Sequence, residues 1–119
     1  MGTVPAICLH VSQIAQLLGY CATYRSYLWQ ATMPTPGRNQ TIRRIQSLQG
    51  KLEKSQEQGQ AEVTLFLDDE EKGTLRHLLS EMLRLYTSMP SSDLRTQQLT
   101  ELAALRLLVE RAFRQTQAL

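Results

Sequence analysis

The stretch Asp68–Leu119, DDEEKGTLRHLLSEMLRLYTSMPSSDLRTQQLTELAALRLLVERAFRQTQAL, decides the fold. Apolar residues recur in it at steps of three and four, the spacing that places side chains on one face of a helix. Before Pro90 they are Leu75, Leu78, Leu79, Met82, Tyr86 and Met89, and after it they are Leu99, Leu102, Leu105, Val109 and Phe113. We expect an antiparallel helical hairpin whose second helix supplies a core or dimer seam.

Local signals mark where these two helices begin and end. Asp68 and Glu71 have the spacing of a capping box, and acidic residues are favoured at a helix N-terminus. Pro90 marks the turn, after which a serine is expected to cap the last helix. Leu107 and Leu108 lie off the main stripe, so this helix is apolar over more than half its circumference. Such a helix is either central in a bundle or shared with another chain.

The segments before the hairpin extend the helical pattern and add one short strand. A helix is expected over Thr41–Gln58, after a loop at Met33–Gly37, and the short apolar start of the chain has Pro5 available to begin a helix. In Glu62–Leu67 the apolar residues Val63, Leu65 and Leu67 alternate with Thr64 and Phe66, as in a strand. A lone strand needs a partner, for which a copy in a second subunit is the expectation. The fold class expected is all-α, with about four helices in a bundle and a single short strand.

Charge divides the chain into two halves. All 119 residues fit one domain with a formal net charge of +2. Residues 1–52 hold five basic and no acidic residues, whereas residues 53–119 hold eight basic and eleven acidic residues. We therefore expect a single helical domain with a basic half, residues 1–58, and a half with the strand and the hairpin, residues 62–119. A basic half either faces a polyanion or docks on an acidic half of its own fold. No internal repeat is visible.

The N-terminal half contains a motif that suggests DNA binding. Residues 11–30, VSQIAQLLGYCATYRSYLWQ, carry Ile14, Ala15, Leu18 and Gly19 at the spacing of a helix-turn-helix. This stretch resembles the DNA-binding motif of bacterial transcription regulators and transposases. The resemblance implies a turn at Gly19 and a second helix that reads bases in the major groove with Thr23–Gln30. The alternative is one continuous helix whose tyrosines pack on the hairpin.

A second resemblance begins at Glu62. Strand, helix and helix in this order resemble the ribbon-helix-helix repressors, whose paired strands enter the major groove of DNA. Here Glu62, Thr64 and Phe66 would face the phosphates without a basic residue among them. The strand therefore serves mainly as an indication of dimerisation.

Other chemistries find little support in the sequence. Cys8 and Cys21 would lie roughly 20 Å apart on one helix, too far for a disulfide, so two buried thiols in a reducing, cytoplasmic compartment are expected. Cys8, His10 and Cys21 lack a spaced fourth zinc ligand. His77 and Glu81 lie one turn apart with no nucleophile indicated. We expect no metal, no cofactor, no small-molecule substrate, no membrane span and no catalytic residue.

The function expected is that of a small, non-enzymatic DNA-binding regulator that forms a homo-oligomer. The partner is double-stranded DNA, and arginines of the acid-free half hold its phosphates. The candidate DNA-contacting residues are Thr23, Tyr24, Arg25, Tyr27, Arg38, Arg43 and Arg44. The alternative function is a homodimeric helical module for protein interaction or assembly, without a nucleic-acid role.

Overall fold

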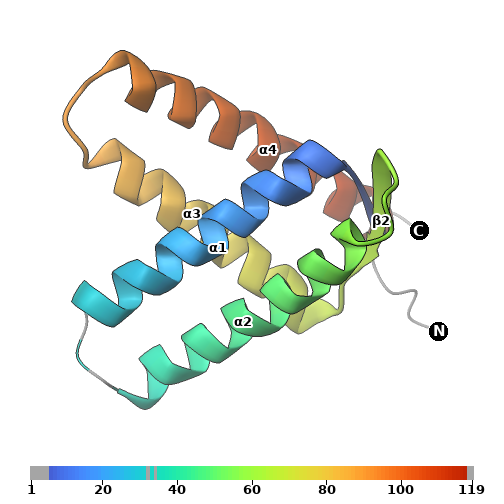
Figure 1. The fold of residues 1–119 in the computed structure, drawn as a ribbon, viewed down its shortest axis with the longest axis horizontal. Helices are drawn as coiled ribbons and strands as arrows, with labels where there is room; N and C mark the ends of the chain where they lie inside the picture. The colour runs from blue at the N-terminus through green and yellow to red at the C-terminus, as the bar shows by residue number, and fades with distance from the viewer. Residues whose placement is uncertain (1–5, 32, 34, 118–119) are drawn as a thin grey trace.

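The computed structural model describes residues 6–31, 33 and 35–117, and within them the chain forms four helices and two short strands. The elements are β1 (Ala6–His10), α1 (Val11–Ala31), α2 (Pro36–Gln56), β2 (Glu62–Phe66), α3 (Asp69–Thr87) and α4 (Asp93–Gln117). The expected helical bundle with a C-terminal hairpin, α3–α4, is confirmed. Figure 1 shows a second hairpin, α1–α2, and places the end of α1, the start of α2 and the α3–α4 turn at the side of the molecule away from the strands.

The strand expected at 62–67 is present, but its partner comes from the same chain. β1 and β2 pair antiparallel, with Ala6 opposite Phe66 and His10 opposite Glu62. Alternate residues of both strands are buried, so this two-stranded ribbon covers the core with one face and exposes the other. Two predictions are therefore wrong: residues 6–10 form a strand and not the start of a helix, and the second strand needs no copy from another subunit. Pro5 lies outside the described residues.

The order strand, helix, helix occurs twice, so the chain contains an internal repeat that the sequence analysis did not find. Both units start with the same device. The backbone N–H of His10 donates to Gln13 Oε1 at 2.9 Å, and that of Asp68 donates to Glu71 Oε1 at 3.0 Å. The expected capping box at Asp68 is confirmed, and the first unit carries a version of it.

The second helices of the two units, α2 and α4, also correspond. The hydroxyl of Thr35 accepts from the N–H of Arg38 at 3.2 Å, and that of Ser92 accepts from the N–H of Arg95 at 3.1 Å. These are equivalent N-caps, and the serine cap expected for the last helix is confirmed. Core-facing positions follow in the same register: Ile42, Ile45, Leu48 and Leu52 of α2 match the partly buried Leu99 and the buried Leu102, Leu105 and Val109 of α4. The two β-α-α units thus share one antiparallel ribbon within a single chain.

Two boundaries differ from the prediction for physical reasons. α2 begins at Pro36 rather than Thr41, because Thr35 caps it and proline is tolerated at the first helical position. Gly59 follows the helix with a φ of +69°, a left-handed conformation that glycine adopts without strain. Met89 lies beyond the end of α3 and is exposed instead of extending its apolar face.

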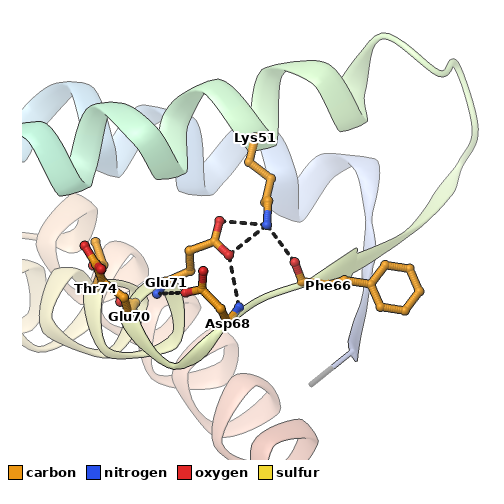
Figure 2. A network of polar contacts seen from close by, with 6 residues as sticks. All are labelled: Lys51, Phe66, Asp68, Glu70, Glu71 and Thr74. Atoms are coloured by element: carbon orange, nitrogen blue, oxygen red, sulfur yellow. Dashed lines mark hydrogen bonds and ion pairs between the residues drawn. The ribbon is translucent and has the colours of Figure 1, made fainter. Parts of the chain in front are cut away.

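A network of polar contacts holds the basic half against the acidic half. Lys51 Nζ of α2 donates to the carbonyl of Phe66 at 2.7 Å and lies 2.7–2.8 Å from both carboxylate oxygens of Glu71 (Figure 2). Arg44 of α2 pairs with Glu70 of α3 at 3.3 Å. Part of the basic half thus docks on the acidic half of the same fold, which was one of the two alternatives that the charge asymmetry of the sequence left open. Among the described helices, none combines the length and apolar content needed to cross a bilayer.

Candidate interaction surface

The region that resembles a helix-turn-helix is one continuous helix. α1 runs from Val11 to Ala31 through Gly19, so the turn that the resemblance implies is absent. Tyr20 and Tyr24 are each only 4% exposed, and the Tyr24 hydroxyl lies 2.9 Å from Nε2 of His77 on α3. Burial raises the pKa of Tyr24 to about 12. Within the predicted base-reading segment, the bundle therefore buries Tyr24 and Leu28. The exposed residues of this segment are Thr23, Ser26, Trp29 and Gln30.

The candidate arginines are dispersed and partly engaged. Arg25 donates to Gln49 Oε1 at 2.7 Å, and the guanidinium of Arg38 lies over the ring of Trp29, 4.3 Å from its centroid. Arg38 is only 8% exposed. Arg44 pairs with Glu70. Arg43 is exposed, and within the described residues it has no charged partner. Tyr27 is partly buried, with the Arg84 guanidinium 5.9 Å from its ring centroid.

The residues predicted as a core or dimer seam form the interior of a single chain. Leu102 and Val109 are fully buried, Leu105 is 2% exposed, and Phe113 lies under Lys72 and Arg76, whose cationic groups are 5.3 and 5.0 Å from its ring centroid. Leu99 is partly buried. This stripe of α4 is consequently occupied by the bundle itself, and it leaves no surface for a second subunit.

The second apolar stripe of α4 faces outward. Leu107 is 52% exposed, with the small residues Ala103 and Ala104 one turn before it. A groove of about 490 Å³ lies on one side of Leu107, between α4 and Leu83 of α3. A second groove of about 570 Å³ lies on its other side, lined by Leu108 and by β1. Leu107 thus forms a ridge between two grooves.

The outer face of the ribbon adjoins the second groove. Ala6 and Cys8 of β1 line this groove, and Phe66, opposite Ala6 on β2, is 60% exposed. Cys8 was expected to be buried, but it lies on the outer side of the strand and is exposed. Cys21 is buried as expected, and burial raises the pKa of its thiol to about 12. We call Leu107, Leu108, Ala103, Ala104 and the β1 residues Ala6 and Cys8 the α4 face.

The equivalent surface of the first unit is polar. The register of the buried positions matches Ala104, Leu107 and Leu108 with Ser47, Gly50 and Lys51 of α2. Lys51 reaches across to the carbonyl of Phe66, whereas its counterpart Leu108 lies at the groove beside Cys8. The same framework therefore has a polar, internally bonded surface in one half and an exposed apolar surface in the other.

A cavity of about 630 Å³ lies between α2 and α3. It is lined by Thr41, Arg44, Asp69, Glu70, Gly73, Thr74 and His77. Arg44 and Glu70 pair with each other across it, and His77 is engaged by Tyr24. Within the described residues, no group of three or more His, Cys, Asp or Glu side chains could hold a metal ion. Comparisons with protein-family models, curated proteins and solved structures found no match.

The sequence analysis did not include the α4 face among its candidate site residues. The signal that could have identified it was present, because Leu107 and Leu108 stand off the stripe that the bundle buries. The sequence did not show which of the two apolar stripes of α4 would be buried by the rest of the chain. The contribution of Ala6 and Cys8 depended on a strand that was not predicted.

Proposed function

We propose that this protein is a non-catalytic interaction module that docks an apolar helix of a partner protein on the α4 face. The observation that carries the proposal is the exposed second stripe of α4, centred on Leu107. A side chain of leucine size gains roughly 1.5–3 kcal/mol when it is fully removed from water. A helix that keeps an apolar side chain of this size exposed, after its other stripe has filled the core, is typical of one shared with a second chain.

The shape of the surface favours a helix as the docked element. Ala103 and Ala104 are small, so another backbone can approach α4 closely beside the Leu107 ridge. The grooves on both sides of that ridge can receive the side chains of a crossing helix, as ridges pack into grooves. The polar counterpart of this face on α2 supports the proposal, because the framework alone does not require apolar residues there.

DNA binding receives less support from the geometry. The predicted reading helix is continuous with the segment before it, and Tyr24 is buried. The outward residues of the ribbon include Glu62 and no lysine or arginine. DNA binding thus stays a prediction without a defined reading element. An exposed free thiol at Cys8 suits a reducing compartment, in keeping with the cytoplasmic location expected from the sequence.

Site-specific photo-crosslinking in the cells that make the protein tests this proposal. One variant replaces Leu107 with benzoylphenylalanine, and its matched control replaces Leu94, which is 66% exposed on the same helix but outside the α4 face. We expect an adduct with a second polypeptide, identified by mass spectrometry, at position 107 and not at position 94. No adduct at 107, or equal adducts at both positions, would overturn the proposal.

A further inference from the structure

We infer that the partner docked on the α4 face is an acidic amphipathic helix of a different protein, with an apolar stripe that covers Leu107 and with aspartate or glutamate on both sides of that stripe. This inference rests on the proposed function and names the chemistry of the partner. It follows from the charged side chains that line the two grooves beside Leu107.

Arginines border the α4 face on both sides of the Leu107 ridge. Arg106 and Arg114 line the groove toward α3, and Arg111 lines the groove toward β1. All three are exposed, and within the described part of the chain no ion pair engages them. The stem of an arginine can lie along an apolar surface while its guanidinium group stays free to bind a carboxylate, so these borders suit a partner with acidic edges.

The acidic residues of α4 do not neutralise these borders. Glu110 lines the first groove, but the guanidinium of Arg76 on α3 donates to both of its carboxylate oxygens, at 2.9 and 3.2 Å. Asp93 and Glu101 belong to the same helix but line neither groove. The remaining charge around Leu107 is therefore positive.

This charge disfavours a second copy of the chain as the partner. In a symmetric pair centred on Leu107, the two faces would bring arginines together, and among the described groove residues neither copy would supply an unpaired carboxylate. Like charges at close range oppose association, whereas carboxylates of a different protein would form charge-assisted hydrogen bonds with the same arginines. The borders thus favour a partner that is apolar in the middle and acidic at its edges.

The first unit of the chain does not share these borders. In the register of the core-facing positions, Gln49 stands in the place of Arg106. Glu57 stands in the place of Arg114, and Lys54 corresponds to the third arginine. The β-α-α framework therefore does not require a basic residue at two of the three positions, and in the second unit the arginines accompany the exposed apolar ridge.

The apolar ridge favours a helix over a polyanion such as DNA. Duplex DNA would bring phosphates to the arginines, but its backbone would leave Leu107 and the grooves beside it without apolar contact. A helix with apolar side chains at three- and four-residue spacing can fill both grooves and carry carboxylates on the flanks of its stripe. Such a helix satisfies the ridge and its borders at once.

Photo-crosslinking from position 107, combined with charge reversal, tests the chemistry of the partner in the cells that make the protein. The probe is benzoylphenylalanine at this position, and mass spectrometry identifies the segment joined to it. We expect a segment whose apolar helical stripe is bordered by aspartate or glutamate. Arg111→Glu combined with Arg114→Glu should lower the adduct yield about 10-fold or more, because each change replaces an attraction with a repulsion.

The matched control reverses the charge of an exposed arginine elsewhere. Arg43→Glu on α2, where no charged partner lies within the described residues, should alter the yield by less than about twofold. Circular dichroism should show unchanged helicity in all variants, since the replaced side chains are exposed. A peptide with the sequence of the crosslinked segment should bind the full chain more weakly as salt rises, and lysines in place of its border acids should restore binding to the doubly reversed variant.

The outcomes separate this inference from the proposed function. An acidic segment whose adduct is lost on charge reversal supports the inference. A basic or uncharged segment, equal yields in the reversed and control variants, or an adduct of twice the 13.6 kDa chain would overturn it and leave the interaction module standing. No adduct at position 107 would overturn the proposed function and the inference together.

Discussion

Replacing Lys51 with methionine tests whether the network in Figure 2 ties the two halves of the bundle together. Lys51 of α2 bonds both β2, through the Phe66 carbonyl, and α3, through the Glu71 carboxylate. Methionine keeps the apolar stem and removes the ammonium group. Among the contacts of the described residues, the Glu71 side chain, only 17% exposed, then keeps the backbone N–H of Asp68 as its donor.

The expected loss of stability follows from these contacts. Removing a charged donor from a largely buried carboxylate costs about 1.5–3 kcal/mol, and the 37% exposure of the Lys51 side chain reduces this to about 2 kcal/mol. For 119 residues the entropy of unfolding is roughly 0.25 kcal/mol per degree. We therefore expect the melting temperature to fall by about 8 °C.

Urea and thermal unfolding followed by circular dichroism measure this change. Lys54→Met is the matched control, because Lys54 is exposed on the same helix without an ion pair in the described part of the chain; it should alter stability by less than about 0.5 kcal/mol. In a Glu71→Gln background, Lys51→Met should cost about 1 kcal/mol less than in the wild type. Equal effects of the two lysine variants, or the same cost in both backgrounds, would refute the reasoning.

Three further measurements test the arrangement of the site residues. In the native protein at pH 8, Cys8 should react with a thiol reagent at least about 100 times faster than the buried Cys21, and peptide mapping that finds equal labelling would contradict this. Burial raises the pKa of Cys21 from 9.0 and of Tyr24 from 10.0, each to about 12. Their contributions to stability are complete below pH 9 and pH 10 respectively and are lost as the pH rises through 12. Unfolding curves should show this loss, with a shallower decline in Tyr24→Phe, and an identical decline would argue against a titrating Tyr24. Fluorescence anisotropy at low ionic strength should show no binding to duplex DNA; salt-sensitive binding that disappears when Arg43 and Arg44 become alanine would restore the DNA hypothesis.

The hairpin was predictable because its signals are local. Asp68 and Glu71 determine a helix start by their spacing alone, and the stripe from Leu102 to Phe113 predicts a helix with an apolar face over this part of α4. The second strand could also be predicted, since alternation has a period of two in any context. These features depend on residues within a few positions of each other.

The features that were missed depend on contacts between distant residues. β1 has Ala6 and Cys8 on its outer side, so it shows little polar alternation and could not be recognised before β2 pairs with it. The repeat is concealed because few equivalent positions are identical, Leu48 and Leu105 among them. Gly19 has open space where its Cβ would lie, so nothing about this glycine forces a turn, and the buried tyrosines favour a continuous helix. The exposed half of α4 became identifiable only when the rest of the bundle was in place.

Joining the two units through a shared ribbon has a consequence for synthesis on the ribosome. β1 emerges before its partner, because the strand that completes it, Glu62–Phe66, is translated only after both helices of the first unit. Until then, the nascent chain displays an unmatched edge with Ile7 and Leu9 uncovered, the kind of segment that chaperones bind and that aggregates with its neighbours. The polar side of α2, with its serine and lysines, keeps the outer surface of this early intermediate hydrophilic until the second unit has been translated.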